Sequence, residues 1–198
     1  MNESGLTLAV HQHVASSDFD LGGLPIGVAG DDVMREARTL DDAARILDAH
    51  TPNGAWTYVI GSGRENAVLC YEVSPKRRAR IATSTTAQGE TFAYSNIYLD
   101  PALAQTEQFF YPAYWRNNTA RFRRMGEALE ATRGAVTANS IAAILGDPGE
   151  PGCRLRSAVS QLTTVASVVF DPTNARLWVA TGRAPVSNNE YIAFDLRR

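Results

Sequence analysis

The segment ETFAYSNIYLDP, residues 90–101, contains the pattern from which the rest of the chain is interpreted. Its alternation predicts a strand that places Phe92, Tyr94, Asn96 and Tyr98 on one face. Three of these side chains are aromatic, and the fourth is a carboxamide that costs about 1–3 kcal/mol if it is buried unpaired. Two interpretations of Asn96 follow. It either ends the strand by bonding the backbone of the next turn, or it is a donor in a dry pocket that faces a substrate oxygen.

Composition indicates one globular domain over residues 1–198. The chain is 44% hydrophobic and 20% charged, with a formal net charge of -2, which suits a sizeable core. This balance predicts no nucleic-acid partner and no membrane-surface partner, and no apolar stretch is long enough to span a bilayer. The residues after Met1 lack the features of a signal peptide, and two cysteines make no disulfide framework, so we expect a cytoplasmic protein.

Periodicity predicts runs of strands separated by runs of helices. The second helix begins at a capping-box variant, Thr39-x-x-Asp42, and Thr137 caps a later one. The order favours an α+β fold with largely antiparallel sheets and helices packed on them. Strands are expected at 6–14, 55–60, 67–73, 78–83, 163–170, 176–181 and 191–196, and helices at 25–38, after Thr39, at 117–133 and from Thr137 to Leu145.

His11 and His13 could present two imidazoles from one strand face to a metal, with Asp18 or Asp20 as a third ligand. The alternative is two half-exposed histidines on the solvent side of the strand. Because metal sites need three or four ligands of fixed geometry, we predict no metal site here. Gln12 lies on the opposite side of the same strand, where the other side chains are apolar.

The two cysteines offer no nucleophile with a recognisable base. Cys70 lies in the middle of a predicted strand and is expected to be a small buried hydrophobe. Cys153 lies in a loop beside Arg154, which could lower its pKa, but no His–Asp arrangement can be placed around it. The glycine spacings fit neither a dinucleotide fingerprint nor a phosphate loop, and we predict no cofactor.

Arg121 borders the apolar stripe of its helix, since it precedes Met125 and Leu129 by four and eight residues. It is either an arginine whose stem passes along the helix edge to water, or a buried cation that holds a carboxylate or orients a catalytic group.

Several motifs, in this order and spacing, resemble the penicillin acyltransferase-like family of the N-terminal-nucleophile hydrolases, and the resemblance covers the whole chain. The segments that carry it are Asn2-Glu3-Ser4-Gly5-Leu6, Tyr71-Glu72-Val73-Ser74-Pro75, Ser95-Asn96, Gly152-Cys153-Arg154, residues 163–172 and Leu177-Trp178-Val179-Ala180-Thr181-Gly182.

The resemblance implies a four-layer αββα sandwich that cleaves or transfers the acyl group of a small acyl-amide. The family's nucleophile is an N-terminal cysteine, exposed by self-cleavage, whose own α-amine is the base. Asn96 matches the family's oxyanion asparagine, Gln12 falls near a second polar pocket position, and Arg121 matches an arginine on the following helix. Tyr94, from the same predicted strand face as Asn96, is also assigned to substrate binding.

The chain departs from the family pattern where the nucleophile should be. The family's cysteine precedes the Asn-Glu-x-Gly-Leu motif, and this sequence begins at that motif; the histidine that usually follows the oxyanion asparagine is Ile97. We therefore expect a fold incomplete on its N-terminal side, with the nucleophile on a missing N-terminal segment or a partner chain. We also expect an inactive isolated chain with an exposed apolar sheet edge that forms homo-oligomers. The alternative is a non-catalytic binding or structural remnant of the fold.

Overall fold

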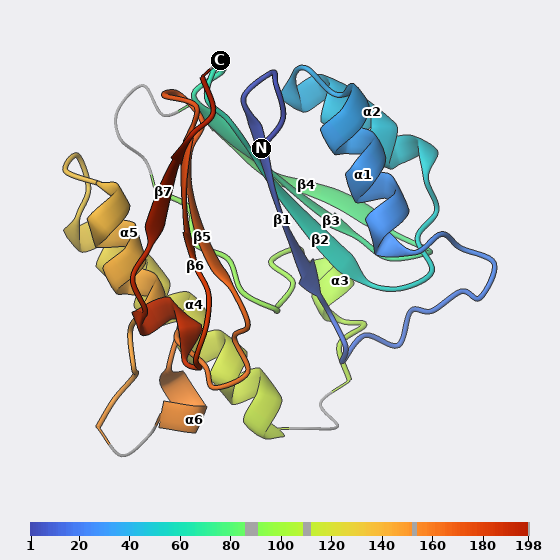
Figure 1. Cartoon of the computed structure of the whole chain (residues 1–198). Helices are drawn as coiled ribbons and strands as arrows, with labels where there is room; N and C mark the ends of the chain where they lie inside the picture. Colours follow the sequence, from blue (N-terminus) through green and yellow to red (C-terminus); the bar gives the residue numbers. More distant parts are fainter. Residues whose placement is uncertain (86–90, 109–111, 152–153, 198) are drawn as a thin grey trace. The chain divides into compact units, whose positions relative to one another are not determined.

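The computed structural model describes residues 1–85, 91–108, 112–151 and 154–197. The chain divides into two compact units (Figure 1). The first unit comprises Met1–Ala87 and Asn96–Tyr111, and the second comprises Gln88–Ser95 and Pro112–Arg198.

The first unit is a four-stranded antiparallel sheet in the order β1-β2-β3-β4, with two helices on one face (Figure 1). Leu8 pairs with Ile60, and Ile60 pairs with Leu69, so that large apolar side chains from three strands share one face. The elements are β1 (Leu6–Gln12), α1 (Ile26–Glu36), α2 (Leu40–Ala49), β2 (Trp56–Ser62), β3 (Ala67–Val73), β4 (Arg78–Thr85) and the short α3 (Pro101–Ala104).

The core of this unit lies between that sheet face and the helices. Val33 of α1 and Leu47 of α2 are buried against strand residues such as Ile60, because each helix repeats its apolar residues on one side. The predicted cap of α2 is confirmed: Thr39 Oγ1 accepts the Asp42 N–H at 3.0 Å, and the Asp42 carboxylate accepts the Thr39 N–H at 3.2 Å.

The second unit contains a three-stranded antiparallel sheet in the order β5-β6-β7 with helices on one side (Figure 1). Its buried strand residues, among them Val169 and Ala180, share one face. The elements are α4 (Pro112–Ala131), α5 (Ala138–Leu145), α6 (Arg154–Ser157), β5 (Ser167–Asp171), β6 (Arg176–Ala180), the 3-10 helix η1 (Val186–Asn188) and β7 (Ile192–Asp195).

The opposite face of this sheet consists of apolar side chains only. The pairing register places six of them there, and all six are at least partly exposed. We call this set the apolar face: Val168, Phe170, Leu177, Val179, Ile192 and Phe194. Ile192 and Phe194 are 59% and 47% exposed.

The α+β class agrees with this mixture of helices and antiparallel sheets. The strand predicted over residues 90–101 is wrong: Glu90 lies outside the described residues, and residues 91–100 form no regular strand. The expected alternation breaks at Ser95, which is buried next to buried Tyr94. In place of a strand ladder, the backbone N–H groups of Leu99 and Asp100 bond to a side-chain carboxylate.

Some boundaries also differ. Helix α4 begins at Pro112, five residues before the predicted start, and α6 lies in a segment predicted to be loop. Strand β1 ends at Gln12 rather than Val14. In the part of the chain that the structure describes, no helix has the length and apolar character needed to cross a membrane.

Candidate active site

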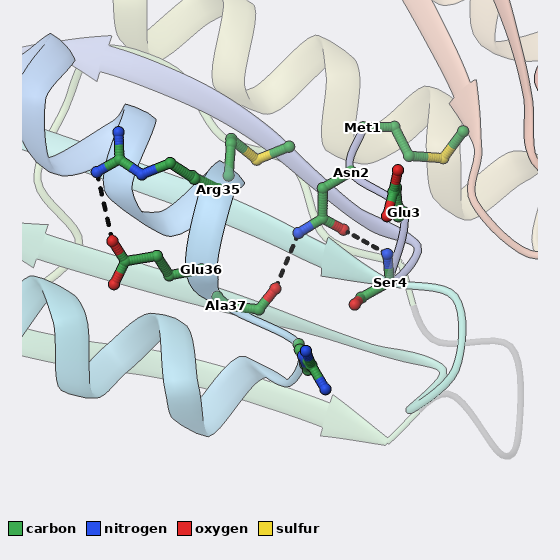
Figure 2. Close-up of a pocket in the computed structure, with 9 residues that line it drawn as sticks. Met1, Asn2, Glu3, Ser4, Arg35, Glu36 and Ala37 are labelled. Atoms are coloured by element: carbon green, nitrogen blue, oxygen red, sulfur yellow. Dashed lines mark hydrogen bonds and ion pairs between the residues drawn. The ribbon is translucent and has the colours of Figure 1, made fainter.

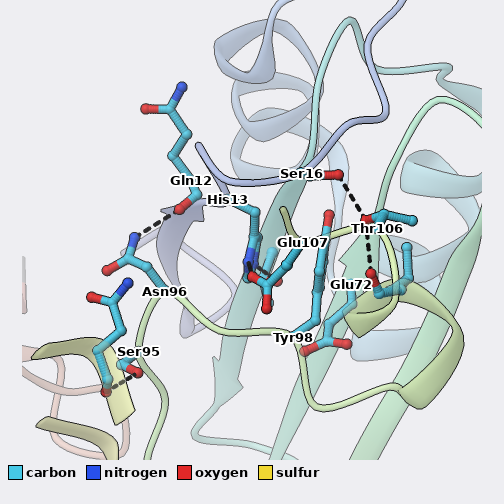
Figure 3. A network of polar contacts seen from close by, with 12 residues as sticks. Gln12, His13, Ser16, Glu72, Ser95, Asn96, Tyr98, Thr106 and Glu107 are labelled. Atoms are coloured by element: carbon cyan, nitrogen blue, oxygen red, sulfur yellow. Dashed lines mark hydrogen bonds and ion pairs between the residues drawn. The ribbon is translucent and has the colours of Figure 1, made fainter. Parts of the chain in front are cut away.

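The side chain of Asn96 is fixed against the end of β1. Its Nδ2 donates to the main-chain carbonyl oxygen of Gln12 over 2.9 Å (Figure 3). The carboxamide is planar and has two N–H donors. A bond to one N–H therefore restrains the orientation of the group.

Gln12 meets Asn96 through its backbone and not through its side chain. The side chain is exposed and extends away from the bond (Figure 3). The side of β1 on which Gln12 lies is buried only at the start of the strand. Leu6 on this side is fully buried, whereas Val10 is 41% exposed. The structure thus brings Gln12 and Asn96 together, with Gln12 as the acceptor that holds the amide.

Directly after Gln12, the imidazole of His13 turns into the protein. It is 2% exposed and stacks on the Tyr98 ring, with centroids 3.6 Å apart and an interplanar angle of 5°. Its Nδ1 lies 3.1 Å from Glu107 Oε1 and its Nε2 lies 2.8 Å from Thr57 Oγ1 (Figure 3). The expectation of a half-exposed His13 on the solvent side is wrong, because β1 has already ended when the chain reaches this residue.

A buried carboxylate holds the other end of the Asn96 segment. Glu72, which is fully buried, accepts the N–H of Leu99 at 2.7 Å and that of Asp100 at 2.8 Å. The phenol of Tyr98 donates to the Val73 carbonyl at 2.9 Å, and burial raises the pKa of this phenol, so it stays a donor. The last residues of β3 therefore fix the irregular segment that carries Asn96.

Sequence reasoning missed His13, Glu72 and Tyr98 as supports of Asn96. A signal for Glu72 was present: it is a carboxylate inside the apolar run of β3, and a buried charge requires partners. No comparable signal marked His13, because its partners Thr57 and Glu107 lie 44 and 94 positions away in the sequence.

The other two candidates belong to the second unit. Arg121 donates from Nε to Asn117 Oδ1 at 3.0 Å and from Nη2 to Asn118 Oδ1, and burial lowers its pKa. Asn118 is 1% exposed, and its carbonyl oxygen accepts the Ser95 hydroxyl at 2.9 Å. Arg121 is thus a half-buried guanidinium oriented by two amides.

Tyr94 is 7% exposed, and its ring centroid lies 6.2 Å from that of Phe92. The structure pairs Asn96 with Gln12 in the first unit, and it places Tyr94 and Arg121 in the second.

Cys70 has the environment of an inert thiol. It is fully buried in β3, and burial, reinforced by the charge of Glu72, raises its pKa well above the ordinary range. A nucleophilic cysteine needs the opposite shift. Cys153 lies outside the described residues, and among those described no group of three or more His, Cys, Asp or Glu side chains could hold a metal.

The N-terminal motif forms a tight turn. Asn2 Oδ1 accepts the N–H groups of Ser4 and Leu6, each at 3.0 Å, and its Nδ2 donates to Ala37 O (Figure 2). Gly5 has a φ of 78°, which favours glycine. With the end of α1, the turn lines an open pocket of about 580 Å³. Within this pocket Arg35 lies 3.3 Å from the Glu36 carboxylate.

The comparison with family models identifies the class of protein. The model described as acyl-coenzyme A:6-aminopenicillanic acid acyl-transferase matches residues 1–185. The chain therefore belongs to the acyl-coenzyme A:6-aminopenicillanic acid acyl-transferase family, and the resemblance seen in its motifs is confirmed. Comparison with curated proteins finds no match.

Proposed function

We propose that this protein takes part in the cleavage or transfer of an acyl group from a small acyl-amide. The observation that carries the proposal is the Asn96 carboxamide, whose orientation is restrained by its bond to the Gln12 carbonyl. Family membership supports the reaction class, since the family description names an acyl transfer.

Attack on an amide carbonyl places negative charge on the carbonyl oxygen. In the proposed reaction, the Asn96 carboxamide donates a hydrogen bond to that oxygen. A donor that is already oriented stabilises the charge without reorganisation during the reaction, and one such donor is worth about 2.7–4 kcal/mol. Gln12 acts here as the acceptor that orients Asn96.

The nucleophile is proposed to be an N-terminal cysteine outside the described residues, on another segment or a partner chain. Cys70 is unsuitable because it is buried and its pKa is raised. A cysteine whose own α-amine is the base needs no separate histidine.

The fold proposed for the active protein is the αββα sandwich of the N-terminal-nucleophile hydrolases. The proposal is supported by the layering within each unit, which has a sheet with helices on one side (Figure 1). In the second unit, the apolar face is suited to packing against another sheet, because all six of its side chains are apolar and none is charged.

Arg121 and Tyr94 are proposed to bind substrate in this assembly. The guanidinium is held by the Asn117 and Asn118 oxygens, which would preorganise it for a substrate carboxylate. Tyr94 would contribute an apolar wall.

A non-catalytic binding or structural remnant of the fold is the second candidate. It is favoured by one observation, namely that Cys70, the cysteine within the described residues, is inert.

The test uses the protein isolated from its native host. The intact mass and the N-terminal sequence of this protein would show whether a cysteine-bearing segment accompanies it. Acyl-β-lactam, dipeptide, acylated amine and fatty amide substrates are then assayed. We expect Asn96→Ala to lower kcat by about 10²–10³. Asn174→Ala, which removes an asparagine bonded to Asp171 within its own turn, should leave turnover unchanged.

Unchanged turnover in Asn96→Ala would reject the role given to Asn96. Ligand binding without turnover in the native assembly would favour the non-catalytic alternative.

A further inference from the structure

Within the part of the chain that the structure describes, a hydrogen bond and a ring stack attach the Asn96 segment to the chain at the end of β1. The first is the bond from Asn96 Nδ2 to Gln12 O. The second is the stack of Tyr98 on His13. His13 follows Gln12 directly and Tyr98 lies two residues after Asn96, so both attachments act between the same two short segments (Figure 3).

The stacked rings are themselves fixed on both sides. The His13 ring is bonded through Nδ1 to Glu107 and through Nε2 to Thr57. The main-chain N–H of His13 donates to Ala55 O at 3.0 Å. Tyr98 is bonded through its hydroxyl to Val73 O. Neither ring can slide without breaking a buried hydrogen bond.

We propose that His13 and Tyr98 are positioning residues that hold the Asn96 carboxamide in register with the Gln12 carbonyl. The Asn96 segment has no strand ladder, so its position depends on side-chain attachments. Among the attachments that follow Asn96 in the chain, the stack is the nearest, whereas the Glu72 bonds hold Leu99 and Asp100, further along. The catalytic purpose of this positioning rests on the function proposed above, where a misplacement of about 1 Å can lower the rate about 10²-fold.

Two substitutions at Tyr98 separate the stack from the hydroxyl bond. Tyr98→Phe keeps the ring and loses the hydroxyl, with its bond to Val73 O. Tyr98→Leu loses both. Phe19→Leu is the matched control, because Phe19 is an aromatic residue of the same unit that is 62% exposed.

The readout is the side-chain amide pair of Asn96 in ¹H–¹⁵N spectra of the full chain, assigned by its disappearance in Asn96→Asp. In the unmodified protein we expect a nuclear Overhauser contact from this pair to backbone protons of His13. The pair should be unchanged in Tyr98→Phe and Phe19→Leu. In Tyr98→Leu it should shift to the position of exposed asparagines and lose the contact.

The proposal is overturned if the contact is missing in the unmodified protein, if Tyr98→Leu leaves the pair unchanged, or if Tyr98→Phe moves it equally far. Should Tyr98→Leu fail to fold, Tyr98→Met keeps more volume and His13→Asn removes the stack from the other side. The same criteria apply to both variants.

These spectra do not depend on turnover. If they come out as expected while Asn96→Ala retains full activity, the positioning stands and the proposed function fails. Where turnover is measurable, Tyr98→Leu should lower kcat about 10²-fold at nearly unchanged KM, and Tyr98→Phe should retain kcat.

Discussion

The side-chain amide of Asn2 donates to the main-chain carbonyl of Ala37 over 2.9 Å, across 35 positions of sequence. Its oxygen also accepts the N–H groups of Ser4 and Leu6. One side chain therefore closes the turn before β1 and ties that turn to the residue that ends α1. Asn2 therefore has a structural role in this chain.

Asn2→Ala should lower the free energy of unfolding by about 1–3 kcal/mol, because it leaves partly buried backbone groups without their partner. Urea denaturation measures this change. Asn2→Asp retains an acceptor for Ser4 and Leu6 but loses the donor to Ala37, so a smaller loss is expected. Glu3→Ala, at an exposed position of the same turn, should stay within about 0.5 kcal/mol of the parent. A loss in Glu3→Ala equal to that in Asn2→Ala would contradict this account.

Cys70 should not react with thiol reagents while the protein is folded. The variant Cys153→Ser leaves Cys70 as the one thiol of the two-cysteine chain. Because the thiol is buried and its pKa is raised, we expect labelling at pH 8 to be at least about 10³-fold slower than in urea-unfolded chain. The rate of labelling is measured by the release of a coloured thiolate from the reagent. Rapid labelling in buffer would show that β3 opens readily.

The ion pair of Arg124 with Asp147 should make the second unit sensitive to acid. Nε and Nη2 of the arginine lie 2.6 and 2.8 Å from the two carboxylate oxygens, and hydrogen bonding by this guanidinium lowers the pKa of Asp147. A lowered folded-state pKa contributes stability above the usual carboxyl pKa, and this contribution is lost as the pH falls through the folded-state value.

Asp147→Asn should therefore cost about 1–2 kcal/mol at pH 7, and the difference from the parent should shrink on acidification below pH 4. Denaturation curves recorded at several pH values test this. Glu127→Gln removes an exposed pair with Arg123 at 3.8 Å and should change little. A difference that is independent of pH would exclude the charge of Asp147 as its cause.

The apolar face should promote self-association of the isolated chain, since large exposed apolar patches are typical of association surfaces. We expect sedimentation coefficients that rise with protein concentration, and a reduced rise in Phe194→Lys, which places a charge on the face. Ala193→Lys is the matched control: Ala193 is the exposed neighbour on the opposite side of β7. If both lysine variants behave alike, net charge and not the apolar face governs association.

The sequence by itself determined the elements whose stabilising contacts are local. The cap at Thr39 was predictable because the hydroxyl and the group it binds lie three residues apart. The same holds for Thr137 and Ser140 at the start of α5. Strand β3 was predicted with its observed ends, Ala67–Val73, because turn residues bound an apolar run on both sides. The motifs also identified the family.

Tertiary structure decided the surroundings of Asn96. The segment around Asn96 looks like a strand in sequence. Two of its backbone N–H groups instead donate to the carboxylate of Glu72, 27 and 28 positions away in the sequence. His13 looks like a solvent-facing strand residue, yet it is buried under Tyr98 between Thr57 and Glu107. A periodic pattern reports only which side chains share a face. Buried polar groups instead take whichever partners the folded chain brings within hydrogen-bonding distance, and those partners are remote in sequence.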